Sequence, residues 1–167
     1  MKKQVFSLLV NNNTGLLSRV AGLFSRRGYN IDSITSGTTM NKSLTRITVV
    51  ATGDVQILSQ IEKQLAKLED VVDIKILKDG ESVCRELIML KVKANAAQRA
   101  EIVAVADIFR AKIVDVETDS LMLEMTGNLS KVEAFLNLMS GYEILELART
   151  GITGLSRGAD GVFDTEA

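Results

Sequence analysis

Apolar residues along the first half of the chain alternate between strand-like and helix-like spacing. A near-continuous apolar run occupies residues 5–10, and apolar residues then recur every three or four positions from Leu16 up to Arg27, which is typical of an inner strand followed by an amphipathic helix. Gly28 is a typical helix end. The later predicted strands are residues 30–37, 44–52 and 71–77, and the second helical stripe consists of Ile57, Leu58, Ile61, Leu65 and Leu68. The predicted order is therefore βαββαβ.

The same order of elements begins again after a polar stretch at residues 78–82, which is typical of a linker. The elements predicted after it are strands at 85–94, 113–117, 121–126 and 143–149 and helices at 97–112 and 129–139. Two units of one order predict an α+β protein with two ferredoxin-like βαββαβ domains in tandem. The predicted boundaries are a first domain at 1–78, a linker at 79–84, a second domain at 85–150 and a C-terminal tail at 151–167.

The C-terminal tail is rich in glycine and ends in acidic residues. Its first part, residues 151–158, holds too few apolar residues for a core of its own. We therefore expect the tail to be disordered, or to become ordered only on a partner, with residues 154–158 as the candidate contact.

Composition excludes several classes of function. The 167 residues carry a formal net charge of -1, whereas a general nucleic-acid binder needs a basic face. We interpret Arg19, Arg26 and Arg27 as a solvated helix face. The opening apolar run is interrupted by Ser7, stops at Asn12 and lacks the cleavage site of a signal peptide. Since no segment approaches the ~18 apolar residues of a membrane span, we expect a cytoplasmic protein.

Residues suited to catalysis are scarce. The chain has no histidine, the commonest general acid or base near neutral pH. It has one cysteine, Cys84, and no glycine-rich phosphate loop. Asp115, Glu117 and Asp119 could be drawn as a metal site, but we favour their interpretation as solvated carboxylates beside a turn. We expect no catalytic residues and no metal or cofactor on this chain.

One turn has the character of a binding site. Residues 12–20, Asn-Asn-Thr-Gly-Leu-Leu-Ser-Arg-Val, follow the first strand and begin the first helix. Free backbone N–H groups at a helix N-terminus attract anions. Asn and Thr are also common helix caps and Gly is common in turns, so these residues alone favour the interpretation of a well-capped helix.

The order of several segments resembles the regulatory (small) subunit of acetolactate synthase, also called acetohydroxyacid synthase. The resemblance spans nearly the whole chain, and only the acidic end after Gly158 is unmatched. The matching segments are residues 12–33, 60–68, 85–87, 109–116, 148–151 and 154–158.

This resemblance implies an N-terminal ACT domain, an amino-acid-binding module of the ferredoxin-like fold, followed by the family's second ferredoxin-like domain. It implies a homodimer through the ACT domains, with a branched-chain amino acid, usually valine, bound at their interface as a feedback inhibitor. It also implies a large catalytic subunit as partner, which the small subunit activates. Thiamine diphosphate, Mg²⁺ and FAD belong to that catalytic subunit, so the resemblance implies a non-catalytic chain.

The family's effector-binding positions can be carried over where the motif matches. Across the dimer interface they fall on Asn30 and Ile31, and in the first turn they fall on Asn12, Thr14, Gly15, Leu16 and Leu17. An α-amino acid needs N–H donors for its carboxylate, oxygen acceptors for its ammonium group and an apolar hollow for its side chain. In this interpretation the helix N-terminus supplies the donors, an Asn oxygen takes the ammonium group, and Leu16, Leu17 and Ile31 line the hollow.

Two rival functions remain at this point. One is a stand-alone ACT-domain sensor of another amino acid or small effector. The other is an enzyme with an unfamiliar carboxylate site, which the absence of histidine and of a paired-carboxylate motif disfavours.

Overall fold

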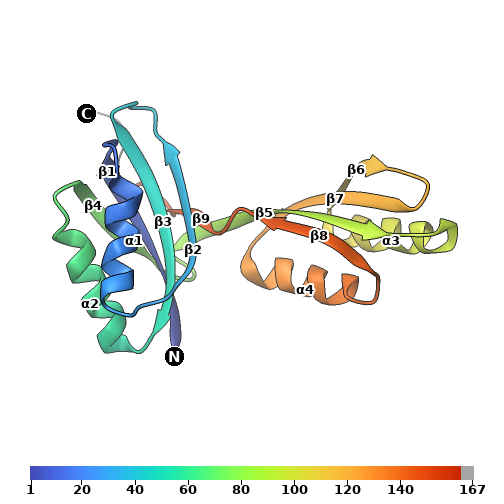
Figure 1. Cartoon of the computed structure of the whole chain (residues 1–167), viewed down its shortest axis with the longest axis horizontal. Helices are drawn as coiled ribbons and strands as arrows, with labels where there is room; N and C mark the ends of the chain where they lie inside the picture. The colour runs from blue at the N-terminus through green and yellow to red at the C-terminus, as the bar shows by residue number, and fades with distance from the viewer. Residues whose placement is uncertain (163–167) are drawn as a thin grey trace. The chain divides into compact units, whose positions relative to one another are not determined.

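The structure is a computed structural model that describes residues 1–162 (Figure 1). The chain divides into two compact units, each described by itself below. The first comprises Met1–Val83 together with the C-terminal segment from Ile152, and the second is Cys84–Gly151. No helix within the described residues is long and apolar enough to cross a membrane.

The first unit is a four-stranded antiparallel sheet with two helices on one face. Its strand order is β2-β3-β1-β4. The elements are β1 (Lys2–Asn11), α1 (Leu16–Arg26), β2 (Ile31–Thr38), β3 (Leu44–Gly53), α2 (Val55–Ala66) and β4 (Val71–Leu77). Both helices pack on the same face of the sheet because each carries one apolar stripe that must be buried. The predicted βαββαβ order is confirmed for this unit.

Alternate residues of the central strands form the core between this sheet and its helices. On β1 these are Phe6, Leu8 and Val10, and on β3 they include Ile47 and Val49, as the period of two in a strand requires. The helices contribute Leu16, Val20, Leu23, Phe24, Leu58, Ile61 and Leu65.

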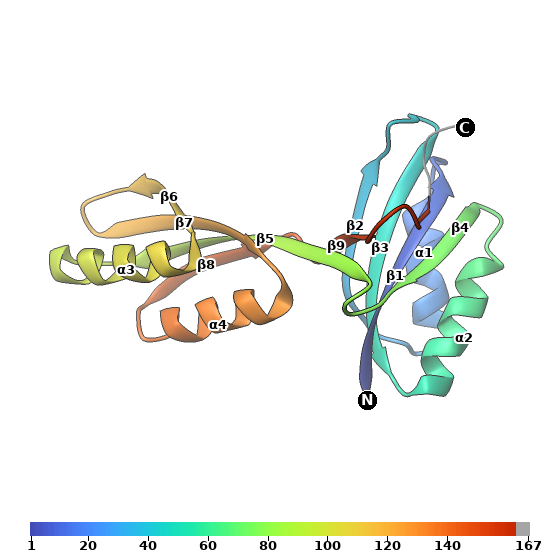
Figure 2. The same ribbon diagram turned by 180° about the vertical axis from the view of Figure 1, so that it is seen from behind.

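The second unit repeats the first in topology (Figure 2). Its antiparallel strand order is β6-β7-β5-β8. The elements are β5 (Ser82–Lys93), α3 (Ala96–Phe109), β6 (Lys112–Val116), β7 (Ser120–Gly127), α4 (Leu129–Met139) and β8 (Ile144–Arg149). Phe109 packs edge-on against the buried Phe135, which joins the ends of the two helical stripes. The predicted fold class, two ferredoxin-like domains in tandem, is confirmed.

Several element boundaries differ from the prediction by one to three residues, and two of these differences have a clear local cause. Strand β5 begins at Ser82, inside the predicted linker 79–84, because the turn is complete within Lys78–Glu81: the Glu81 N–H donates to the Lys78 carbonyl (3.2 Å). Helix α3 ends at Phe109, although the spacing predicted residues 97–112. Arg110 adopts the left-handed conformation (φ 56°), which stops a helix.

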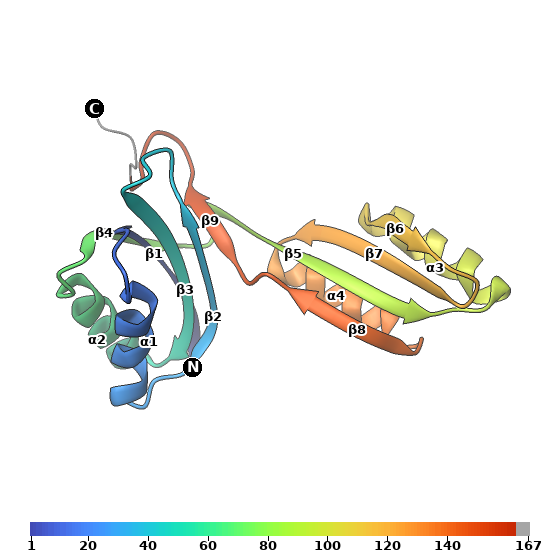
Figure 3. The ribbon, with the colours of Figure 1, turned by 45° about the horizontal axis from the view of Figure 1, so that its top comes forward.

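The C-terminal segment is ordered on the first unit. Residues Thr153–Ser156 form strand β9, which pairs with β5, and the segment continues across the sheet face opposite α1 and α2 (Figures 2 and 3). Ile152 and Val162 are each only 8% exposed. The prediction that this segment is disordered, or ordered only by a partner, is therefore wrong for residues 152–162. Its few apolar residues need no core of their own, because they add to a sheet face that already exists.

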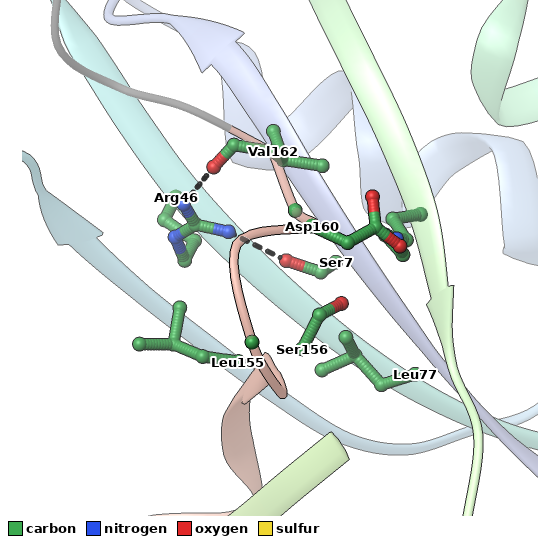
Figure 4. A pocket seen from close by; sticks show the side chains of 10 residues that line it. Ser7, Arg46, Leu77, Leu155, Ser156, Asp160 and Val162 are labelled. Carbon is green, nitrogen blue, oxygen red and sulfur yellow. Dashed lines mark hydrogen bonds and ion pairs between the residues drawn. The ribbon is translucent and has the colours of Figure 1, made fainter. Parts of the chain in front are cut away.

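Polar contacts fix the end of this segment on the sheet (Figure 4). The Arg46 guanidinium donates from Nη2 to the Val162 carbonyl (2.7 Å) and from Nη1 to Ser7 Oγ (2.8 Å). Lys75 forms an ion pair with Asp160 and thereby lowers the pKa of that carboxyl. A cavity of about 290 Å³ lies among these residues. The segment therefore covers this face incompletely.

A pair of substitutions in this segment tests its packing. We expect Ile152→Ala to lower the free energy of unfolding of the first unit by about 2 kcal/mol, because it removes buried methyl and methylene groups. Leu155→Ala lies in the same segment, but Leu155 is 61% exposed, and we expect a change within about 0.5 kcal/mol. Calorimetric unfolding of the full chain measures both. Equally small effects would show that residues 152–162 do not pack on the sheet.

Candidate functional site

The turn between β1 and α1 is built from backbone hydrogen bonds to two other connections. The Asn11 N–H donates to the Asp70 carbonyl and the Asn12 N–H to the Ser43 carbonyl, both at 2.8 Å. Gly15, the N-cap residue of α1, has φ 81°, a conformation that other L-residues adopt only with strain. The chain therefore needs glycine where it turns from the strand into the helix.

Helix α1 begins without a side-chain cap. Within residues 1–162, the other three α-helices each have one: Asp54, Asn95 and Asn128 accept from backbone N–H groups at 2.8–2.9 Å. No side chain caps α1, and its first turn holds no acidic residue. The interpretation of this turn as a well-capped helix is therefore excluded. The Leu16 N–H donates to the Asn13 carbonyl (3.3 Å), and the N–H groups that follow it in the first turn can donate to an anion.

Asn12 is held in an orientation that suits an ammonium group. Its Nδ2 donates to the Lys42 carbonyl in the β2–β3 connection (3.3 Å), which directs the amide oxygen away from that carbonyl. This exposed oxygen is an acceptor that remains for a ligand. The neighbouring Asn13 is used differently, because its Nδ2 donates to Asp70 Oδ1 (2.8 Å).

Arg19 and Asp70 form a charged pair beside this turn. Arg19 Nε donates to Asp70 Oδ2 (2.7 Å), and Arg19 Nη1 reaches the Thr14 carbonyl (3.3 Å). Hydrogen bonds from Asn13 and then from Arg19 hold the pKa of Asp70 below its ordinary value. The prediction that Arg19 lies on a solvated helix face agrees with its exposed side chain, although its guanidinium is also tethered to Asp70. Sequence reasoning missed Asp70 entirely.

The structure divides the predicted effector-binding residues into three groups. Asn12, Thr14 and Gly15 lie on the exposed turn, and Leu17 is exposed on the first turn of α1. Leu16 points into the core and is 5% exposed, so its side chain does not line an open hollow. Asn30 and Ile31 lie just before β2 and at its first residue.

The turn and the start of β2 lie at opposite ends of one sheet (Figure 1). Ile31 and Gln4 both pair with Ala51, whereas Asn11 pairs with Leu44 at the other end of β3. Gln4 and Asn11 are seven positions apart on β1, or about 24 Å at about 3.4 Å per residue. A single chain therefore does not bring Asn30 and Ile31 to the turn.

Comparisons with protein families assign both parts of the chain. Residues 6–73 match the family model described as the AHAS small subunit-like ACT domain. Residues 85–158 match the model described as the small subunit of acetolactate synthase. Together the two models cover the larger part of both units.

Individual relatives agree with these assignments. A probable acetolactate synthase small subunit from Methanothermobacter thermautotrophicus is 47% identical over 156 residues, which are 93% of each chain. The acetolactate synthase small subunit of Mycolicibacterium smegmatis is 44% identical over 93% of this chain and 92% of its own. The crystal structure of the small subunit from Thermotoga maritima, 39% identical, superposes with a TM-score of 0.87 over 96% of this chain and 100% of its own. The chain thus belongs to the family of acetolactate synthase small subunits.

Proposed function

We propose that this chain is the non-catalytic, regulatory subunit of acetolactate synthase in branched-chain amino acid biosynthesis. It activates a large catalytic subunit, which carries thiamine diphosphate, Mg²⁺ and FAD. It also confers feedback inhibition by valine, which binds where two ACT domains meet. The proposed position of the effector rests on one observation. The two parts of the predicted site, the turn before α1 and the start of β2, lie at opposite ends of a sheet whose edge strand is β2.

A two-fold dimer through β2 would complete this site. Thr38, at the end of β2, pairs with Thr45, which also pairs with Val10 of β1. The end of β2 therefore lies at the same end of the sheet as the turn. If β2 pairs antiparallel with its copy, Ile31 of the partner subunit comes beside Thr38 and hence to the end of the sheet at which the turn lies. The two-fold axis generates two equal sites.

The chemistry of the turn suits an α-amino acid. The N–H groups of α1 would bind its carboxylate, and Asn12 would accept from its ammonium group. Leu17 and Ile31 of the partner subunit would contact its side chain. Charge-assisted hydrogen bonds contribute about 1.5–3 kcal/mol each, and burial of a valine side chain contributes about as much. After the cost of association, this supports an affinity on the order of micromolar to millimolar.

Substitution of Gly15 tests the position of the effector. We expect Gly15→Asp to abolish binding of L-valine, because the new carboxylate repels the ligand's carboxylate and pairs with Arg19, whose Nη1 lies 3.3 Å from a Cβ built at Gly15. Gly15→Asn has nearly the same size and tolerates a positive φ, so it should weaken binding less. Calorimetric titration with L-valine, with D-valine as control, measures both variants.

An acetolactate assay with the catalytic subunit separates the two proposed roles. Both Gly15 variants should still activate the catalytic subunit, whereas Gly15→Asp should remove inhibition by L-valine. If Gly15→Asp and Gly15→Asn lose activation together, the substitution has damaged the fold and the proposed separation fails. Equal L-valine affinities of wild type and Gly15→Asp would exclude the turn as the effector site.

Matched lysine substitutions on the two edge strands test the dimer. Ile34, on β2, is 37% exposed, and Val72, on the opposite edge strand β4, is 54% exposed. We expect Ile34→Lys to convert a dimer into a monomer and to lose L-valine binding, because a charge at an apolar interface is desolvated without a partner. Val72→Lys should remain a dimer that binds L-valine. Sedimentation velocity measures the association state, and the reverse pattern would move the interface to β4.

A further inference from the structure

We propose that Asp70 is a positioning residue of the effector site and that Arg19, which Asp70 holds in place, binds the carboxylate of the amino-acid effector. This inference rests on the proposed function, since it assumes that the effector occupies the turn before α1.

Asp70 is joined to the turn at three points. It lies in the connection between α2 and β4, it is 9% exposed, and its own carbonyl accepts from the Asn11 N–H (2.8 Å). Its two carboxylate oxygens accept separately, Oδ1 from Asn13 and Oδ2 from Arg19. The first contact fixes the end of β1, the second fixes the turn, and the third fixes a side chain of α1. Through its backbone carbonyl and its buried carboxylate, Asp70 thus contacts the end of β1, the turn and α1.

The third contact determines where the guanidinium lies. Arg19 is bound by Asp70 through Nε, and its Nη1 is placed against the Thr14 carbonyl, 3.3 Å from a Cβ built at Gly15. The cation therefore stands beside the first residues of α1, where the backbone N–H groups have no side-chain cap. A fork of N–H donors next to a helix N-terminus matches a carboxylate in both geometry and charge. Because the Arg19 side chain remains 47% exposed, a ligand can reach it.

The pair is poorly explained as a stabilising contact alone. Ion pairs with one partner half exposed contribute little to stability, because solvent screens them and the long arginine side chain must be ordered. The effect of the pair on geometry is larger, since it restricts the rotation of the Arg19 side chain beside the place proposed for the ligand's carboxylate. A preorganised donor costs less entropy when the ligand binds.

Substitutions at both positions, with a matched control, test the inference in the full chain and in its complex with the catalytic subunit. The variants are Arg19→Met, Arg19→Lys, Asp70→Asn, the double variant Arg19→Met/Asp70→Asn, and the control Asp73→Asn on the exposed part of β4. The probes are L-valine and L-valinamide, which lacks the carboxylate. Calorimetric titration gives the affinities, and thermal unfolding shows that each variant is folded.

We expect Arg19→Met to weaken binding of L-valine about tenfold, because one good charge-assisted contact is lost. The affinity for L-valinamide should be nearly unchanged.

Asp70→Asn removes a negative charge, so electrostatics alone would tighten the binding of a carboxylate, whereas loss of positioning weakens it. We expect weaker binding, and no additional loss when Asp70→Asn is added to Arg19→Met. Arg19→Lys, which keeps the charge but not the fork, should fall between wild type and Arg19→Met. Asp73→Asn should bind like wild type.

The outcomes separate this inference from the proposed function. If wild type binds L-valine and Arg19→Met weakens L-valine and L-valinamide equally, or neither, Arg19 does not contact the carboxylate and the inference fails while the proposed function stands. Tighter or unchanged binding of L-valine by Asp70→Asn overturns the positioning role. If Arg19→Met does not fold, the affinities of Arg19→Lys for L-valine and L-valinamide are compared instead. Equal changes for both probes, or no change for either, then overturn the inference. Absence of L-valine binding by wild type, alone and in the complex, overturns both proposals.

Discussion

The register of β1 is the constraint on which the first unit depends. This strand pairs along its whole length with β3, from Lys2 opposite Gly53 to Asn11 opposite Leu44, and on its other side with β4. A shift of one residue would turn Phe6, Leu8 and Val10 away from the helices. It would also move Asn11 away from the Asp70 carbonyl that ends the strand. The position of the turn before α1 is therefore a consequence of how the core packs.

Burial on both faces explains why β1 is apolar almost without interruption. Val10 and Leu8 face the helices, while Leu9 and Ser7, on the other face, are also buried. The C-terminal segment lies on this second face (Figure 2). Ser7 is tolerated there because Arg46 donates to its hydroxyl. Because Arg46 also donates to the Val162 carbonyl, one side chain of β3 links the polar interruption of the first strand to the C-terminal segment.

Sequence periodicity predicted most of the fold because the apolar stripes of the helices and strands are local. It correctly placed residues 12–20 at the junction of β1 and α1, and the family resemblance supplied the residues expected at the site. It could not reveal the Arg19–Asp70 pair, whose members are 51 positions apart, since no local spacing relates them. The family resemblance assigned Leu16 to the ligand hollow, although the first turn of α1 directs this side chain into the core. The C-terminal segment was misjudged for a related reason: its apolar residues are few, and the face that buries them is formed elsewhere.

A site divided between two copies makes effector binding and assembly one equilibrium. If the effector contacts the turn of one chain and the start of β2 of the other, it binds the dimer and not the monomer, so it stabilises the dimer by mass action. The reverse also holds, because a partner that stabilises the dimer raises the apparent affinity for the effector by the same free energy. Donors of the turn that are fixed before the ligand arrives raise the affinity of this divided site. Asp70 fixes them from within one chain, which leaves the second chain to supply the remaining contacts.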